Sequence, residues 1–316
     1  MNPPRSSRVL YIGSWSLVAY TVLIILWGAW VRLSGSGDGC GDHWPLCNGE
    51  LVPLERVTKT WVEYSHRIST ALYGAFVLTQ IWLSRRYFGR KHPARFWALM
   101  TLLFTITEAL IGRQLVTSGL VNESTDLSRL LVMPLHLVNT SLLLFSGVMT
   151  AESVRFGGLP RKRLSAQIRN RGVAYLSGLT LVLITGAIAA LGSHLMPSQS
   201  LLHGLTHDLS PDSHPAVRLR ILHPLVALAL PVSMLILGYL PGSASAATSQ
   251  FRWYRRFSAG LIVAVGIGLA TLSLLAPLWL KIIHLLMTNI LVILASLCIF
   301  HSLRPVPMPL ETETPV

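Results

Sequence analysis

Charged side chains are scarce in this chain of 316 residues. They make up 12% of it, whereas hydrophobic residues make up 52%. Soluble globular domains carry about 25% charged residues, and disordered chains contain few apolar ones, so this composition excludes both classes. Acidic residues are the rarer charge, 13 against 26 Lys and Arg, which leaves a formal net charge of +13.

Long apolar runs take the place of the missing charges. A membrane helix needs roughly 20 mostly apolar residues, and eight runs reach that length without the alternation typical of barrel strands. The first run is too long, and its exit too rich in Gly and Asp, for a cleaved signal peptide. We therefore predict an all-α integral membrane protein with eight transmembrane helices. The eight runs are Val9–Leu33, Glu63–Leu83, Phe96–Val116, Leu130–Thr150, Val173–Gly192, Leu219–Leu240, Phe257–Ala276 and Leu278–Ser302.

Basic residues gather in the connections on one side of these runs, and most acidic residues lie on the other side. Because Lys and Arg mark cytoplasmic loops, we predict that both termini are cytoplasmic, in a bacterial cytoplasmic membrane. The net charge then reflects membrane topology rather than nucleic-acid binding. The basic residues that set this orientation are Arg5, Arg8, Arg85, Arg86, Arg90, Lys91, Arg95, Arg155, Arg161, Lys162, Arg163, Arg169, Arg171, Arg252, Arg255 and Arg256.

Cysteine is also rare, with three residues in the chain. Cys40 and Cys47 both lie in the first outer connection, and a short disulfide loop is expected there because that side faces an oxidising compartment. A redox-active pair and a metal site with His43 are the alternatives, although two Cys and one His are a weak zinc signal. Cys298 is predicted to be an inert buried thiol.

Ionisable side chains recur near the outer ends of the even-numbered runs. Glu63 and His66 are three residues apart, so they share a helix face. His136, His223 and His284 lie near the starts of runs four, six and eight. Placing an ionisable group at membrane depth costs free energy, so each of these residues is a candidate functional residue.

Other polar groups have simpler interpretations. Glu108 lies near mid-depth in run three, and an internal pair with Arg113 is one interpretation of it. The connection after run five is rich in histidine, but its irregular spacing favours a solvated loop over a metal site. Those histidines are His194, His203, His207 and His214.

The two halves of the chain look like repeats of four helices. His66 follows Gly28 by 38 residues, and His223 follows Gly186 by 37. Four crossings return the chain to its starting side, so the halves would share one topology, as parallel repeats do. The predicted organisation is an N-terminal repeat at 1–155, a basic linker at 156–172, a C-terminal repeat at 173–303 and a tail at 304–316.

The repeat decides how the four histidines are interpreted. A lone membrane histidine usually hydrogen-bonds a neighbouring helix, but two per repeat at equivalent depth favour axial ligation of haem iron. The expected pairs are His66 with His136 and His223 with His284. Proton relays and Zn or Cu sites are the alternatives, with zinc disfavoured because each half offers two His ligands. Outer-side cations that would meet haem propionates are Arg32, Arg67, Arg113, Arg129 and Arg220.

The halves differ three residues before the first histidine of each pair, where Glu63 in one half matches Arg220 in the other. Ligands alone suit electron transfer, whereas ligands beside a carboxylate suit proton-coupled chemistry. We therefore predict a reactive site in the N-terminal half and a redox or structural site in the C-terminal half.

Together these motifs resemble the haem A synthase family over nearly the whole chain. The resemblance implies that His66 and His136 hold substrate haem O, and that His223 and His284 ligate haem b. Glu63 would lie beside the C8 methyl group, which successive hydroxylations oxidise to a formyl group. Cys40 and Cys47 match the outer-loop pair of the family, but the second pair of some relatives is absent. The motifs are residues 31–37 and 44–47, 63–67, 117–120 and 136–140, with His223 and His284.

Three other functions fit parts of the pattern. A di-haem b-type electron-transfer protein would use the same histidines, and so would a non-catalytic haem carrier for oxidase assembly. A transporter is disfavoured because no helix pair is clearly interrupted at mid-membrane. The expected partners of the enzyme are haem O, the haem O synthase, an electron donor, the lipid bilayer and a second copy of the chain.

Overall fold

The computed structural model describes residues 5–54, 57–122, 124–157, 166–229 and 249–302. Within these ranges the chain is almost entirely helical, as predicted. The helices are α1 (Arg5–Leu33), α2 (Thr58–Tyr87), α3 (Pro93–Thr117), α4 (Arg129–Phe156), α5 (Ala166–Leu195), α6 (Leu201–Leu209), α7 (Pro215–Leu219), α9 (Ser249–Ser273) and α10 (Leu278–Ser302). A further helix occupies residues 222–229, where the described range stops.

Local sequence signals account for several helix ends. His92 caps α3, because its Nδ1 accepts a hydrogen bond from the Ala94 amide at 3.3 Å. Pro93 follows as the first helical residue, where its missing N–H has no partner to lose. Gly157 ends α4 with a φ of 72°, a conformation that glycine adopts without a steric cost.

Six of the helices are long and apolar enough to cross a membrane, among the residues that the structure describes. They correspond to six of the eight predicted runs. The second run forms α2, which packs between α1 and α3 but is not among the six. The sixth run extends past residue 229 and so falls partly outside the described residues. The six spans are Arg8–Leu33, Pro93–Thr117, Arg129–Phe156, Leu176–Leu195, Arg252–Ser273 and Leu278–His301.

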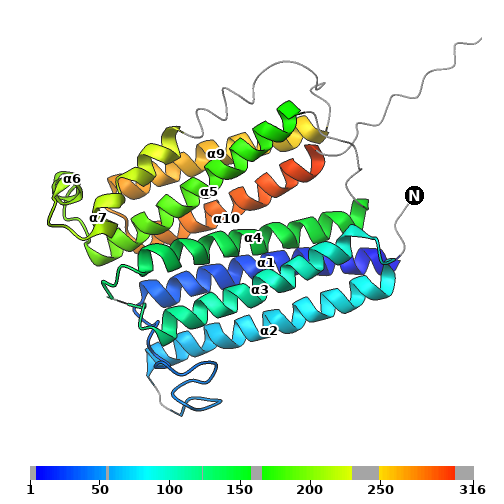
Figure 1. Cartoon of the computed structure of the whole chain (residues 1–316), viewed down its shortest axis with the longest axis horizontal. Helices are drawn as coiled ribbons and strands as arrows, with labels where there is room; N and C mark the ends of the chain where they lie inside the picture. Colours follow the sequence, from blue (N-terminus) through cyan, green and yellow to red (C-terminus); the bar gives the residue numbers. More distant parts are fainter. Residues whose placement is uncertain (1–4, 55–56, 123, 158–165, 230–248, 303–316) are drawn as a thin grey trace, which may run out of the picture.

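The long helices lie side by side, with α1–α4 on one side and α5, α9 and α10 on the other (Figure 1). The helix α4 is central, since it packs against α1 and α3 in its own half and against α5 and α10 in the other. Val18, Leu144, Val148 and Val292 form one buried cluster across the two halves. This apolar contact holds the halves in a fixed relation.

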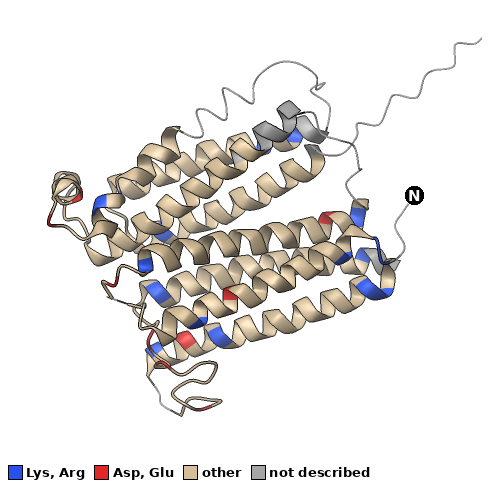
Figure 2. Cartoon of the chain, in the orientation of Figure 1, with Lys and Arg blue, Asp and Glu red and all other residues tan. Residues whose placement is uncertain are grey.

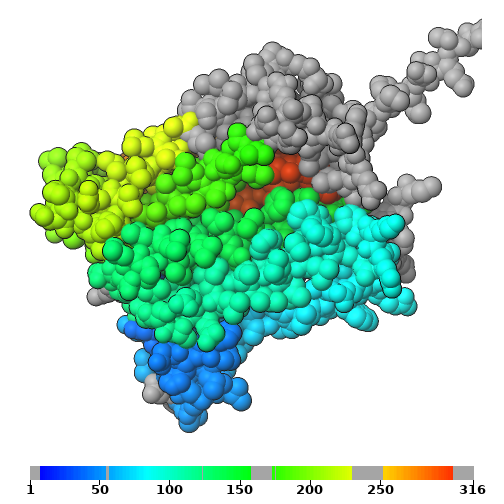
Figure 3. Space-filling model, viewed as in Figure 1, coloured from blue at the N-terminus to red at the C-terminus, as the bar shows by residue number. Residues whose placement is uncertain are grey.

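The start of α1 and the end of α10 lie at the same end of the bundle (Figure 1). Charged residues lie mainly at the two ends of the helices, and their middle is largely uncharged (Figure 2). The disulfide-containing connection and the α6–α7 connection protrude at the opposite end from the terminus of α1 (Figure 3). The cytoplasmic assignment of the terminal end stays a prediction.

One boundary differs from the sequence prediction. The helix α5 begins at Ala166, inside the linker predicted at 156–172. Arg169 and Arg171 therefore belong to the first turns of α5, because an apolar run can be extended by polar residues beyond the bilayer. Residues 158–165 and the tail after 302 lie outside the described part of the chain, as do Arg161, Lys162 and Arg163.

Candidate functional site

His66, on the third turn of α2, points at the backbone of α1. A Cβ atom added to Gly28 would lie 2.8 Å from His66 Nε2. The backbone carbonyl of Ile24, one turn earlier on α1, is within reach of the same ring. Only glycine leaves room for the imidazole there, so Gly28 sets how close the ring comes to α1.

His223 is placed in the same way in the other half. A Cβ atom on Gly186 of α5 would lie 3.1 Å from His223 Cε1. The Thr185 hydroxyl lies 3.3 Å from His223 Nδ1, and the Val182 carbonyl, one turn before Gly186, is within reach of the ring. A Gly residue and a carbonyl one turn earlier thus contact a histidine in both halves.

His223 and His284 face one another across the second half. Their ring centres are 6.2 Å apart, with ring planes inclined at 75°. Two imidazoles bound to opposite sides of one metal ion, with bonds of about 2.0–2.1 Å, place their ring centres roughly 6 Å apart. His284 Nδ1 is buried without a hydrogen-bond partner in the described chain, and Gly268 of α9 leaves the room beside its ring. The pair therefore fits axial ligation of a haem iron.

His136, near the start of α4, lies beside Glu108 of α3. Its Nδ1 is 3.2 Å from Glu108 Oε1, and His66 is close enough to it for an electrostatic interaction. The same carboxylate accepts hydrogen bonds from the Thr140 hydroxyl and from Asn139 Nδ2, the latter at 2.7 Å. The structure thus brings His66, His136 and a carboxylate together in the first half.

The interpretation of Glu108 as the partner of Arg113 is wrong. Both oxygens of the Glu108 carboxylate face α4, where Asn139 and Thr140 donate to them. Arg113 is five residues further along α3, so its side chain leaves the helix on a different face and is exposed. Sequence spacing alone does not reveal the contact, because the partners of Glu108 lie on the next helix.

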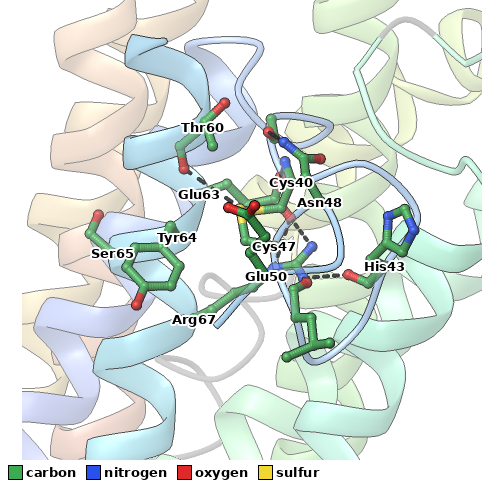
Figure 4. Close-up of a disulfide and its surroundings, with 12 residues drawn as sticks. Cys40, His43, Cys47, Asn48, Glu50, Thr60, Glu63, Tyr64, Ser65 and Arg67 are labelled. Atoms are coloured by element: carbon green, nitrogen blue, oxygen red, sulfur yellow. Dashed lines mark hydrogen bonds and ion pairs between the residues drawn. A yellow bond between two sulfur atoms is a disulfide. The ribbon is translucent and has the colours of Figure 1, made fainter. Parts of the chain in front are cut away.

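Glu63 is buried, with 4% of its surface exposed, and is fully engaged. Its carboxylate accepts a hydrogen bond from the Cys40 amide at 2.8 Å and another from Arg67 Nε at 3.1 Å. Arg67 Nη1 donates in turn to the carbonyl oxygens of His43 and Leu46, both at 2.6 Å. Figure 4 shows this network closing the outer loop over the start of α2.

The outer loop itself is closed by the predicted disulfide between Cys40 and Cys47. Both cysteines are almost fully buried, at 0% and 1% exposure. Cys40 therefore links the disulfide to the start of α2. Its side chain forms the disulfide, its backbone amide donates to Glu63, and Glu63 in turn pairs with Arg67. The i, i+4 spacing of Glu63 and Arg67 is a helical ion-pair signal that the sequence interpretation missed.

Arg220 performs an equivalent task in the second half. It forms an ion pair with Asp208 of α6 and donates to the Met196 carbonyl at 2.8 Å and to Ser198 Oγ at 3.0 Å. It also donates to the Gly204 carbonyl at 3.2 Å. Arg67 and Arg220 thus each fasten an outer connection, and their predicted contact with haem propionates stays a prediction.

A second group of cations lies at the outer ends of the helices where the halves meet. Arg32 of α1, Arg129 of α4 and Lys281 of α10 are within electrostatic range of one another, and His194 of α5 joins them. Arg129 has 1% of its surface exposed, and its Nε has no hydrogen-bond partner within the described residues. Arg129 Nη1 donates to the carbonyl oxygens of Asn122, at 3.0 Å, and Ser124, but these are neutral groups. A buried cation without a counter-ion is costly, so this group is suited to receive an anion.

Comparison with known proteins identifies the family. Residues 12–296 match the family COX15-CtaA, described as cytochrome oxidase assembly protein. The chain belongs to the COX15-CtaA family. It is 37% identical over 294 residues, 91% of its length, to a Thermus thermophilus protein named protoheme IX farnesyltransferase. It covers 47% of that protein, so it spans about half the length of this relative.

Shorter matches connect this COX15-CtaA chain to proteins named heme A synthase. Those of Bacillus cereus and Bacillus anthracis are 37% identical over 98 residues, which is 31% of this chain and 32% of each relative. The resemblance stated from the sequence motifs is thereby confirmed at the level of the family. The haem ligands and the catalytic residue of this COX15-CtaA member stay predictions.

Proposed function

We propose that this protein is a haem A synthase, which oxidises the C8 methyl group of haem O to a formyl group by successive hydroxylations. His66 and His136 hold substrate haem O in the first half, and His223 and His284 hold haem b in the second. The observation that carries the proposal is the 6.2 Å separation of the His223 and His284 rings, which suits an iron between them. The Gly28–His66 contact supports an equivalent site in the first half.

When bound, haem iron supplies the redox chemistry of the reaction. The residues of the chain hold the two porphyrins, orient the methyl group and exclude water. A binding site for anionic groups lies between the two halves and is formed by Arg32, Arg129 and Lys281. We assign the haem propionates to this site because guanidinium groups pair well with carboxylates. This assignment gives the buried Arg129 a counter-ion.

Glu63 has two roles in this proposal. Through Cys40 and Arg67 it holds the outer loop closed over the first half. A carboxylate one turn before His66 also lies at the reactive end of α2, where it moves a proton during oxidation of the methyl group. The matching position of the second half is Arg220, which cannot take up a proton, in line with a haem b that only transfers electrons.

The architecture that we propose is two parallel four-helix repeats with eight spans and cytoplasmic termini. α2 would be the second span and the helix that starts at residue 222 the sixth. The Gly–His contacts support this repeat, and so do Thr140 and Thr288, whose hydroxyls bond the backbone carbonyls of His136 and His284 at 2.8 and 2.9 Å. An electron donor and the haem O synthase are the expected partners.

Farnesyl transfer to protohaem is the second candidate, because the Thermus relative carries that name. We assign that activity to the half of the relative that this chain does not cover. Prenyl diphosphates are usually held through Mg²⁺ and clustered carboxylates. Within the part of the chain that the structure describes, no three acidic, His or Cys side chains gather in a metal-binding group.

The test is expression of the full chain in a host that makes haem O but no haem A, followed by mass analysis of the extracted haems. Haem A and its hydroxylated precursor are the expected products. Haem O alone, with quinol-driven reduction of two b-type haems, would instead support a di-haem electron-transfer protein. Conversion of protohaem and farnesyl diphosphate to haem O would support the prenyltransferase function.

A further inference from the structure

The helix α3 contains one acidic residue, Glu108, and this residue is held entirely by α4. Its Oε2 accepts a hydrogen bond from Asn139 Nδ2 at 2.7 Å. Asn139 is itself positioned, since it donates to the Phe104 carbonyl at 3.0 Å and accepts from Thr107 Oγ1 at 2.7 Å. The carboxylate is therefore fixed in direction rather than free to rotate.

The other carboxylate oxygen faces the imidazole of His136. Glu108 Oε1 lies 3.2 Å from His136 Nδ1 and also accepts the Thr140 hydroxyl. The ring nitrogen is not aligned as a hydrogen-bond donor in this conformation, so the contact is electrostatic. A carboxylate at Nδ1 leaves Nε2 as the nitrogen for a metal, which is the usual division of work in a metal-ligating histidine.

Among the described residues of the second half, no carboxylate lies at the Nδ1 atom of either histidine. His223 Nδ1 faces the neutral Thr185 hydroxyl at 3.3 Å. His284 Nδ1 has no hydrogen-bond partner in the described chain, and Gly268 lies beside the ring, where an added Cβ atom would come 3.2 Å from Cε1 and 3.8 Å from Nδ1. The two halves therefore differ at two places. Glu63 of the first half is matched by Arg220 in the second, and a carboxylate lies at the Nδ1 atom of His136 but not at that of His223 or His284.

We propose that Glu108 is a positioning residue for His136, which it orients and makes more electron-donating toward the first-half haem. The proposal depends on the proposed function only in taking His136 as an iron ligand. Negative charge behind an imidazole strengthens its bond to ferric iron more than to ferrous iron. The first-half haem is consequently harder to reduce than it would be with a neutral partner, and the second-half haem lacks this effect.

The test is a potentiometric titration, followed by optical and EPR spectroscopy, of the full-length protein loaded with haem O. The component that is lost in His136→Ala identifies the first-half haem. In Glu108→Gln its reduction potential should rise by about 59 mV, the one-electron equivalent of a tenfold loss of preference for ferric iron. The potential of the second-half haem should not move.

A second variant separates positioning from packing. Thr140→Val keeps the carboxylate but removes a donor that shares Oε1 with His136, so it should lower the first-half potential. A rise in Thr140→Val equal to that in Glu108→Gln would indicate general loosening and overturn the proposal. So would an unchanged first-half potential in Glu108→Gln.

The matched control is a second His–Glu pair in the same protein, which is more deeply buried than the first. Glu152 Oε2 lies 3.1 Å from His301 Nε2 at the opposite end of α4, where neither residue is a proposed ligand. Glu152→Gln should leave both potentials unchanged. These potentials can be measured whether or not haem A is formed, so failure of this inference is distinguishable from failure of the proposed activity.

Discussion

The imidazole of His66 lies directly against Gly28, so that a single methyl group at Gly28 would come within 2.8 Å of the ring nitrogen. Gly186 stands in the same relation to His223, at 3.1 Å. In both halves, a glycine on the neighbouring helix thus sets the position of a candidate haem ligand. Each histidine can keep its position only while the opposing helix presents bare backbone.

Gly28→Ala should displace His66 and weaken haem binding in the first half by tenfold or more. Gly186→Ala should do the same to the second half, more mildly, because its contact is longer. The measurement is the haem-to-protein ratio of the purified variants by pyridine haemochrome spectra. Gly112→Ala is the control, since a Cβ atom there meets nothing within 4 Å and helical Gly→Ala changes at open positions stabilise by about 0.4–1 kcal/mol.

Glu63→Ala should abolish haem A formation while haem remains bound, and it should also destabilise the outer loop. Breaking a buried ion pair by removing one partner costs about 3–5 kcal/mol, and Arg67 would be left unpaired. Glu63→Gln separates the two effects in part, because its single amide oxygen can still accept from Arg67 at the Oε1 position, whereas the NH₂ group that replaces Oε2 cannot accept from the Cys40 amide. If Glu63→Gln is more stable to heat than Glu63→Ala but still forms no haem A, the carboxylate takes part in the reaction. Full haem A formation by Glu63→Gln would instead show that the role of Glu63 is structural alone.

Cys47→Ser should lower the stability of the protein by about 2–3 kcal/mol, the value expected for losing a short disulfide-closed loop. The loop would also release the His43 and Leu46 carbonyls from Arg67. Thermal unfolding with and without a reductant measures the effect, and the variant should no longer respond to the reductant. Cys298→Ser is the control, and the reductant should lower its melting temperature as it does that of the wild type. If Cys298→Ser no longer responds to the reductant, the sensitive group is not the Cys40–Cys47 disulfide.

Arg32→Gln should weaken retention of haem without destabilising the haem-free protein. The Arg32 side chain makes no ion pair or hydrogen bond within the described part of the chain, and its neighbours Arg129 and Lys281 repel it. Removing this charge relieves repulsion but deletes a partner for a propionate. Haem dissociation rates and the melting temperature of the haem-free protein check both parts. The control is Arg85→Gln, an exposed cation in the last turn of α2, which should change neither.

Much of this architecture follows from the sequence because membrane helices obey a simple length rule. The six apolar spans correspond to predicted runs, and the Cys40–Cys47 disulfide was expected from its loop. The similar spacings of Gly28–His66 and Gly186–His223, 38 and 37 residues, indicated a repeat, and the structure shows that each glycine contacts its histidine. These features depend on local composition and on regular helical geometry, which a sequence displays directly.

The partners of the polar side chains were not predictable in this way. Glu108 was interpreted as a neighbour of Arg113 on its own helix, whereas it binds Asn139 and Thr140 about 31 residues further along the chain. The sequence also did not indicate the ion pair of Arg220 with Asp208 or its hydrogen bonds to Met196, Ser198 and Gly204. Such contacts depend on the rotation of each helix about its axis, which apolar runs do not specify.

The sequence by itself determined the class of the protein, a multi-pass bundle of long apolar helices. It did so because burial in lipid leaves an unmistakable compositional record. Only the tertiary structure decided which carboxylate touches which histidine, since that depends on how α3 and α4 turn their faces together. In the first half the packing of α3 on α4 directs Glu108 to His136, whereas the contact of α2 with the disulfide loop directs Glu63 to the Cys40 amide.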